Sequence, residues 1–198
     1  MFDSLIRNLE TRGYHAVCFD TLDAATAYID SEIDQTTVGI GGSLTVKELK
    51  LDELLSTQNT LYWHWLKDRA AAEQRKLAMQ TEVYISSVNG IAETGEIVNI
   101  DASGNRLASL NYGHKPLYLI VGSNKIRPTM EDAIWRARNV AAPLNAQRLG
   151  RKTPCAVHAD KCYDCNSPER ICRSLDIMWR PNNGMTVTVV LINESLGA

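Results

Sequence analysis

The sequence predicts an α/β fold in which a mostly parallel sheet has helices on both faces, a Rossmann-like arrangement. Short β-prone runs alternate with stretches of helical periodicity, and such alternation is typical of parallel sheets with right-handed crossovers. One run, residues 117–121, is apolar throughout, as expected for a central strand buried on both faces. The chain has 198 residues, of which 44% are hydrophobic, and we expect a single domain over residues 1–198.

The first half of the chain supplies most of the expected alternation. Apolar residues at helical spacing predict a helix over residues 2–11, and Gly13 provides its end. A stretch at 67–81, rich in Ala, Gln, Arg and Lys, has strong helix propensity. The other expected elements are helices at 22–33 and 45–55 and strands at 14–19, 37–40, 60–65, 83–88 and, near the end of the chain, 186–192.

The second half contains a predicted insertion. Two β-prone runs, 97–101 and 106–110, are separated by Ala-Ser-Gly-Asn, which predicts a β-hairpin inserted between the parallel units. Thr129 and Asp132 resemble a capping box that opens a long helix, and Pro143 should bend or interrupt that helix. The Cys-rich C-terminal region that follows contains several prolines and is expected to be a loop.

Composition and charge narrow the classes of function. The formal net charge is −2, whereas nucleic-acid binding relies on clustered lysines and arginines, so nucleic acid is not an expected partner. The sequence has no run of about 18 apolar residues, the length that a membrane-spanning helix requires. Charged residues are mixed with apolar ones in residues 1–12, unlike a signal peptide. We therefore expect a cytoplasmic protein with no membrane span.

Two strand ends that contain glycine mark the expected ligand pocket, since α/β sheets bind ligands at the carboxyl ends of their strands. The turn after the strand at 37–40 exposes backbone N–H groups before a helix, which suits a carboxylate or phosphate, although a tight structural turn is an equal alternative. After the strand at 117–121, Lys125 could hold an anion or be an ordinary solvated lysine. The candidate ligand-binding residues are Gly41, Gly42, Ser43, Thr45, Asn89, Thr94, Gly122, Asn124 and Lys125.

Glu93 is the candidate catalytic residue. It lies in a segment, residues 87–101, that gathers carboxylates and amides around a strand end and the predicted hairpin. A carboxylate partly shielded from water beside a pocket can act as a base or a nucleophile. A solvated carboxylate merely belongs to a turn, and that alternative is the commoner one for glutamate.

Four of the five cysteines form the most specific pattern in the chain, Cys155-x6-Cys162-x2-Cys165-x6-Cys172. Clustered cysteines in a reducing cytosol favour metal or redox chemistry over structural disulfides. Four thiolates in one loop could complete a tetrahedral zinc site or hold an iron-sulfur cluster. The outer spacings match neither a zinc ribbon nor a ferredoxin, so a redox dithiol or disulfide pair and plain reduced cysteines stay open as alternatives.

Several segments together resemble the LUD (lactate-utilisation) family over most of the chain. The most telling segments are 87–95, 99–101, 104–106, 121–126 and 162–172, which read SVNGIAETG, NID, GNR, VGSNKI and CYDCNSPERIC. The resemblance implies a fold similar to sugar-phosphate isomerases and coenzyme A transferases, with a pocket where the two glycine turns, Glu93, Thr94 and Lys125 converge. It also implies a role in the oxidation of lactate to pyruvate alongside iron-sulfur partner proteins. The long lactate-utilisation subunits carry ferredoxin-like cysteine segments beyond this domain, whereas this chain resembles the short, single-domain branch.

These observations leave three functions open. The first is a lactate-utilisation protein, a component of or accessory to the oxidation of lactate to pyruvate, that binds a small anionic molecule and carries a four-cysteine metal or iron-sulfur site. The second is a small-molecule isomerase or transferase that uses Glu93, and the third is a non-enzymatic ligand sensor. The sequence decides neither whether the chain is an enzyme nor its oligomeric state, a homo-oligomer included.

Overall fold

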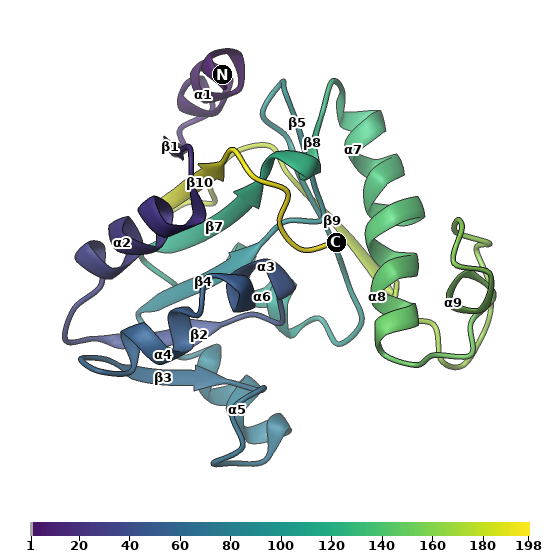
Figure 1. The fold of residues 1–198 in the computed structure, drawn as a ribbon, viewed down its shortest axis with the longest axis horizontal. Coiled ribbons are helices and arrows are strands. Elements are labelled where there is room, and N and C mark those ends of the chain that lie inside the picture. Colours follow the sequence, from purple (N-terminus) through teal and green to yellow (C-terminus); the bar gives the residue numbers. More distant parts are fainter. Residues whose placement is uncertain (1) are drawn as a thin grey trace.

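The computed structural model describes residues 2–198, and its main sheet has six strands, all parallel, in the order β1-β10-β7-β4-β2-β3 (Figure 1). The strands are β1 (His15–Phe19), β2 (Thr37–Ile40), β3 (Thr60–Trp63), β4 (Val83–Ser87), β7 (Leu117–Gly122) and β10 (Val187–Ile192). Each overlaps a run that the sequence predicts as a strand. Helices cover both faces of the sheet, so the predicted α/β class is confirmed.

The apolar core lies on either side of β7 and β10, whose residues are all buried. Side chains alternate between the faces of a strand, and accordingly Leu117 and Leu119 belong to one apolar cluster, whereas Tyr118 and Ile120 belong to the other. The first cluster is covered by α1 (Asp3–Thr11), α5 (Ala71–Ala78) and α6 (Asn105–Asn111), and the second by α2 (Leu22–Glu32), α3 (Leu44–Glu48) and α4 (Leu51–Leu55). The uninterrupted apolar run at 117–121 is therefore explained by helices on both sides.

A smaller sheet of four strands, in the order β8-β5-β6-β9, lies beside a long helical column (Figure 1). Its strands are β5 (Gly90–Ala92), β6 (Ile97–Asp101), β8 (Ile126–Arg127) and β9 (Ser174–Met178). The column consists of α7 (Met130–Arg136), the π-helical segment η2 (Ala137–Ala141) and α8 (Ala142–Arg148). Thr129 caps α7 by accepting the Asp132 N–H at 3.1 Å. Pro143 lies in the first turn of α8, directly after η2, where the α-helical pattern is interrupted.

The predicted hairpin between residues 97–101 and 106–110 does not form; the run at 97–101 is instead the second strand of a hairpin with the preceding strand β5. β5 pairs antiparallel with β6, whereas residues 106–110 form part of α6. The Asp101 carboxylate accepts the N–H groups of Arg106 and Leu107 at 3.0 and 3.2 Å, which favours the start of a helix. Arg106 and Leu110, one helical turn apart, are both buried. Capping and burial therefore outweigh the turn signal in the sequence.

Other elements also differ from the prediction. The expected helix at 45–55 is divided into α3 and α4, because Lys50 between them has a left-handed backbone with a φ of 50°. The sequence did not indicate β9, which pairs antiparallel with β6 and has two exposed residues, Ser174 and Leu175. The short helices η1 (Ser123–Lys125) and α9 (Pro154–His158) complete the fold. None of the helices within residues 2–198 is both long and apolar enough to cross a membrane.

Candidate functional site

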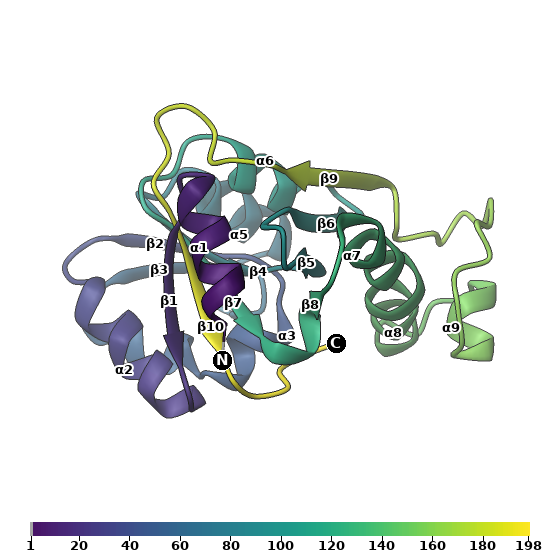
Figure 2. The ribbon, with the colours of Figure 1, turned by 90° about the horizontal axis from the view of Figure 1, so that it is seen from above.

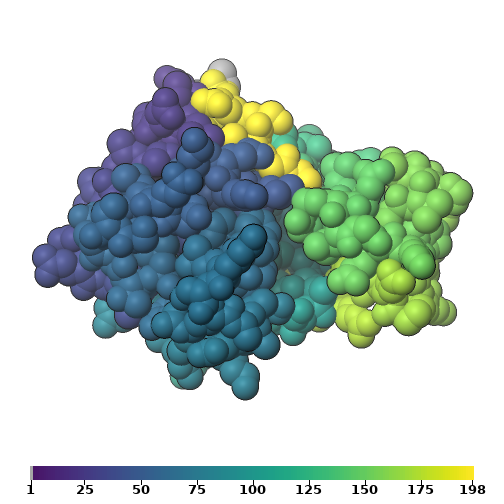
Figure 3. All heavy atoms as spheres, turned by 60° about the horizontal axis from the view of Figure 1, so that its bottom comes forward, coloured from purple at the N-terminus to yellow at the C-terminus, as the bar shows by residue number. Residues whose placement is uncertain are grey.

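A pocket of about 150 Å³ lies at the carboxyl edge of the main sheet, facing α8. Its walls come from residues at the ends of β2, β4 and β6, from Lys125 after β7, and from η2 and α8. Figure 3 shows the surface recess between the blue part of the chain and the green segment that includes α8. Because parallel strands end at the same edge, residues far apart in the sequence meet here.

The structure brings part of the predicted ligand-binding set to this pocket. The members that line it are Gly42, Ser43, Thr45, Asn89 and Lys125. Gly41 is also closely packed, since a Cβ there would come within 2.8 Å of the Ser86 hydroxyl. Ser43 caps α3, with its Oγ accepting the Val46 N–H at 3.3 Å. The glycine turn is therefore both a structural turn and a wall of the pocket.

The other predicted residues lie outside the lining. The Asn124 Oδ1 accepts the Leu196 N–H at 3.2 Å, and a Cβ on Gly122 would come within 2.8 Å of the same oxygen. Asn124 thus anchors the segment that follows β10, and Gly122 leaves room for this contact because it has no side chain. Glu93 and Thr94 are exposed in the turn between β5 and β6. The expected convergence of Glu93 and Thr94 with the glycine turns is not seen.

Lys125 is the buried amine of the pocket and is only 3% exposed. Its Nζ donates hydrogen bonds to Thr45 Oγ1 at 2.6 Å and to Ser87 Oγ at 2.8 Å. A buried ammonium group is usually paired with a carboxylate. In the described part of the chain, however, Lys125 forms no ion pair.

The surroundings of Lys125 disfavour its charged form. Burial is the main cause, the positive charges of Arg136 and Arg106 add to it, and the negative charge of Glu48 opposes it. Together they lower the pKa of Lys125 from 10.5 to about 7. A substantial fraction of this amine is therefore unprotonated at neutral pH, unlike an exposed lysine.

Two buried arginines fix the strand ends around the pocket. The Arg106 guanidinium donates to the side-chain oxygens of Asn89 and Asn99 at 2.9 and 2.6 Å and to two backbone carbonyls. Arg136 donates to the carbonyl oxygens of Asn89 and Asn124 at 2.5 and 2.9 Å. Neither arginine forms an ion pair within residues 2–198, so both add to the positive potential of the site.

The other charged side chains that line the pocket are Arg148 and Asp101. Arg148 is exposed, its guanidinium donates to Asn145 Oδ1 at 2.6 and 3.1 Å, and it lies 5.6 Å from the centre of the Trp65 ring. Asp101 is already engaged with the backbone N–H groups that begin α6. The pocket therefore has an excess of positive side chains, which suits a small anion.

Sequence patterns did not indicate Ser87, Arg106 or Arg148 as pocket residues. Ser87 and Arg106 belong to segments that carry the resemblance described above, and this was the signal that could have found them. The run at 106–110 instead suggested a strand. Arg148 lies on a helix far along the chain, and only the tertiary structure brings it to the sheet edge.

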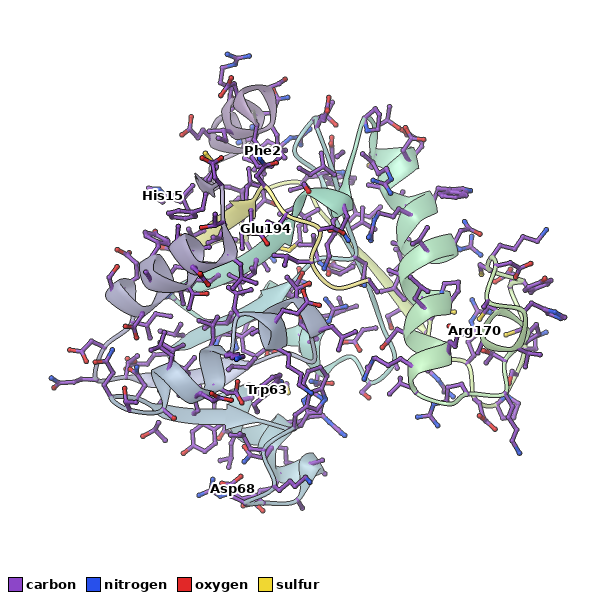
Figure 4. The ribbon with its side chains drawn as sticks, viewed as in Figure 1. Phe2, His15, Trp63, Asp68, Arg170 and Glu194 are labelled. Atoms are coloured by element: carbon purple, nitrogen blue, oxygen red, sulfur yellow. The ribbon has the colours of Figure 1, made fainter. Side chains whose placement is uncertain are left out.

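The four cysteines of the array line a second, smaller cavity, which α8 residues line as well. The loop around α9 lies at the outer end of the molecule, beside α8 (Figure 2). All four are free and half-buried: Cys155, Cys162, Cys165 and Cys172. Two arginines line the same cavity. Arg138 donates to Cys162 Sγ at 3.8 Å, and Arg170, labelled in Figure 4, donates to the carbonyl oxygens of Cys165 and Cys172.

The cysteine cavity is not a preformed metal site. Among residues 2–198, no group of three or more His, Cys, Asp and Glu side chains is arranged to hold a metal ion. The four thiols nevertheless surround one space, and two residues, Ala142 and Ile171, line both this cavity and the Lys125 pocket. The two sites are therefore neighbours that share a wall.

A family model and a solved structure are similar to this chain. The sequence model of the LUD domain matches residues 2–192. The chain is similar in structure to a DUF162 family protein from Deinococcus radiodurans, with a TM-score of 0.52 and 11% sequence identity over 97% of this chain and 98% of that one. At this identity the likeness shows the fold alone. No curated protein matches the chain.

Proposed function

The chain belongs to the LUD-domain family, which is associated with lactate utilisation, and from this premise we propose that it binds a small carboxylate of lactate metabolism in the Lys125 pocket. In this proposal the chain is a component of, or accessory to, the oxidation of lactate to pyruvate. Its cysteine array is a second site, which holds zinc or an iron-sulfur cluster.

The observation that carries the anion site is a buried lysine without a carboxylate partner. Burying an unpaired cation is costly, and an incoming carboxylate would relieve that cost. Lys125 has two hydroxyl partners and no ion pair in the described structure, and it lies near Arg106 and Arg136. An anion in the pocket would offset all three charges. Arg148 at the exposed edge would attract the anion as it enters.

The cysteine site is supported by its donor set. Four thiols are the ligands that zinc and iron-sulfur clusters prefer, and all four surround one cavity. Arg138 and Arg170 beside them would balance the negative charge of a metal-thiolate centre. Zinc would cross-link the loop, whereas a cluster would add the capacity to take up an electron. To bind zinc or a cluster, the four sulfurs would have to move closer together, because within residues 2–198 they are not arranged to hold a metal ion.

The anion site is tested by thermal unfolding in the presence of lactate, pyruvate, acetate and phosphate, each added separately. We expect lactate or pyruvate to raise the unfolding temperature, since a ligand that binds only the folded state stabilises it. Replacing Lys125 with Met should weaken this binding about tenfold or more, because a charge-assisted hydrogen bond is lost. The control is Lys76→Met on the exposed face of α5, which should bind normally. Equal ligand effects in both variants would contradict the proposal.

The cysteine site is tested by metal analysis and visible spectroscopy of protein purified without oxygen. Zinc without colour, or iron with sulfide and a visible absorption band, would identify the occupant. Joint replacement of Cys162 and Cys165 by Ser should remove it, whereas Cys18→Ser should not, because Cys18 is exposed and lies outside the array. A folded, colourless protein without metal would contradict this part of the proposal.

Two alternative functions make different predictions. An isomerase or transferase that uses Glu93 would lose turnover in Glu93→Gln while keeping its fold. A non-enzymatic sensor would be stabilised by its ligand and form no product. The exposed position of Glu93, outside the pocket lining, favours the anion pocket over Glu93 as the centre of the chemistry.

A further inference from the structure

We infer that Lys125 is a nucleophile that forms a reversible imine with the carbonyl carbon of a small 2-oxo acid bound in this pocket. The inference rests on the proposed anion site and deepens it, because it names the class of ligand and a chemical step. The amine lies on the wall of the pocket, between two hydroxyl groups that orient it.

The hydrogen bonds of Lys125 leave one direction of its nitrogen unused. A tetrahedral amine nitrogen has two N–H bonds and one lone pair. Both N–H bonds can be accounted for by Thr45 Oγ1 and Ser87 Oγ, at 2.6 and 2.8 Å. The remaining position carries the third proton of an ammonium group or the lone pair of an amine. No other partner of this nitrogen is seen within residues 2–198, so the lone pair can meet a carbon atom in the pocket.

The two hydroxyl groups are not equivalent. Thr45 donates its own proton to the Leu196 carbonyl oxygen at 3.3 Å, so its oxygen serves as an acceptor for Lys125. Ser87 also accepts from Lys125, but in the described structure its own proton has no acceptor. Ser87 lines the pocket, and its hydroxyl can therefore donate to the oxygen of a bound carbonyl group.

The charges around Lys125 maintain a supply of the neutral amine. Arg136 and Arg106 lie on two different elements, and with burial they outweigh the single opposing carboxylate, Glu48. With a pKa of about 7, roughly half of the amine is unprotonated at pH 7. In an ordinary lysine with a pKa of about 10.4, less than about one thousandth of the amine is unprotonated at pH 7.

The imine step balances without a redox partner. The Lys125 lone pair attacks the carbonyl carbon, a C–N bond forms, and the π electrons move to oxygen, which takes a proton by way of Ser87. The proton that reaches the oxygen comes from the nitrogen, which gives a neutral carbinolamine. The second nitrogen proton follows the same route through Ser87 to the hydroxyl group, the C–O bond breaks, water leaves, and the nitrogen electron pair forms the C=N bond. The positive charges of Arg106 and Arg136, which disfavour an ammonium group, would also favour the carboxylate beside the carbonyl group through the potential of the site.

The size of the pocket favours a short acid. A cavity of about 150 Å³ holds a molecule of roughly six non-hydrogen atoms, the size of benzene or of pyruvate. A 2-oxo acid of this size offers both features that the site recognises, a carboxylate and an adjacent carbonyl group. Lactate has the carboxylate but no carbonyl group, so it would bind without forming the covalent bond.

The test is reduction of the purified protein with borohydride in the presence of pyruvate, followed by mass spectrometry and peptide mapping. We expect one reductively alkylated lysine per chain, at Lys125, and excess lactate should suppress it. The Lys125→Arg variant keeps the positive charge but should give no adduct. The exposed Lys76 in the same sample is an internal control for non-specific reaction.

The outcomes separate this inference from the function on which it rests. Stabilisation by pyruvate without an adduct at Lys125 overturns the imine and leaves the anion pocket standing. Equal labelling of Lys76 and Lys125 also overturns the imine. If neither pyruvate nor lactate stabilises the protein, the anion pocket itself fails, and the imine fails with it.

Discussion

Replacing Lys125 with Met should make the stability of the protein less dependent on pH. The pKa of Lys125 is about 7 in the folded chain, well below the value of 10.5 for a lysine free of these surroundings. Between these two values the unfolded chain binds more protons than the folded one, so the wild-type stability should rise with pH. Below pH 7 both states are protonated, and this contribution becomes constant. Methionine does not titrate, so the variant lacks the rise altogether.

The size of the effect follows from the two pKa values. The wild-type chain should gain about 2 kcal/mol from Lys125 between pH 7 and pH 9, by the linkage of protonation to folding. The loss of the hydrogen bonds to Thr45 and Ser87 also changes the stability of the variant, but that change does not depend on pH. Comparing the two proteins at two pH values removes it.

Urea unfolding of both proteins at pH 7 and pH 9 measures this difference. We expect the stability of Lys125→Met relative to wild type to fall by about 2 kcal/mol from the lower to the higher pH. Other titrating groups are common to both proteins and cancel. If the relative stability is the same at both pH values, Lys125 has an ordinary pKa, and the reasoning about its surroundings is refuted.

Three further predictions follow from the contacts around the site. Arg106→Met should destabilise the protein by about 3 kcal/mol or more in urea unfolding, because it removes a buried guanidinium group with four hydrogen bonds and leaves the buried Asn99 Oδ1 without a donor; a loss below about 1 kcal/mol would contradict this. Gly90→Ala should lower the unfolding temperature measurably, since its Cβ would lie 2.6 Å from the Ala133 carbonyl oxygen of α7. An unchanged unfolding temperature would contradict this, because it would mean that α7 can shift away at little cost. Glu93→Gln should change the free energy of unfolding by less than about 0.5 kcal/mol and leave pyruvate binding intact, because Glu93 is exposed. If calorimetry shows that pyruvate no longer binds this variant, Glu93 belongs to the binding site after all.

The sequence was sufficient for the class of fold because its signals are local and repeated. Strands and helices alternate, and the apolar run at 117–121 marks the centre of the sheet, where β7 is buried throughout. The run at 106–110 was misassigned because a short apolar stretch fits a strand or a helix equally well. The contact that decides it, between the Asp101 carboxylate and the first N–H groups of α6, depends on the three-dimensional turn.

The candidate site was only partly predictable. The glycine turn and Lys125 could be placed at the carboxyl edge of the sheet from the order of the elements alone. The burial of Lys125 could not, since it depends on Thr45 and Ser87 closing around the amine from other strand ends. Glu93 shows the converse, because its position in a distinctive segment suggested a role, whereas the turn exposes it to water.

The most direct test of the account is calorimetric titration with lactate at pH 8, in two buffers that differ in ionisation enthalpy. Free Lys125 is mostly neutral at this pH, and a bound carboxylate should raise its pKa, since an adjacent opposite charge favours the ammonium form. We predict uptake of roughly half a proton or more per bound lactate in the wild type and none in Lys125→Met. Binding with the same proton uptake in both proteins, or no binding to the wild type, would contradict the proposal that this buried lysine meets the anion.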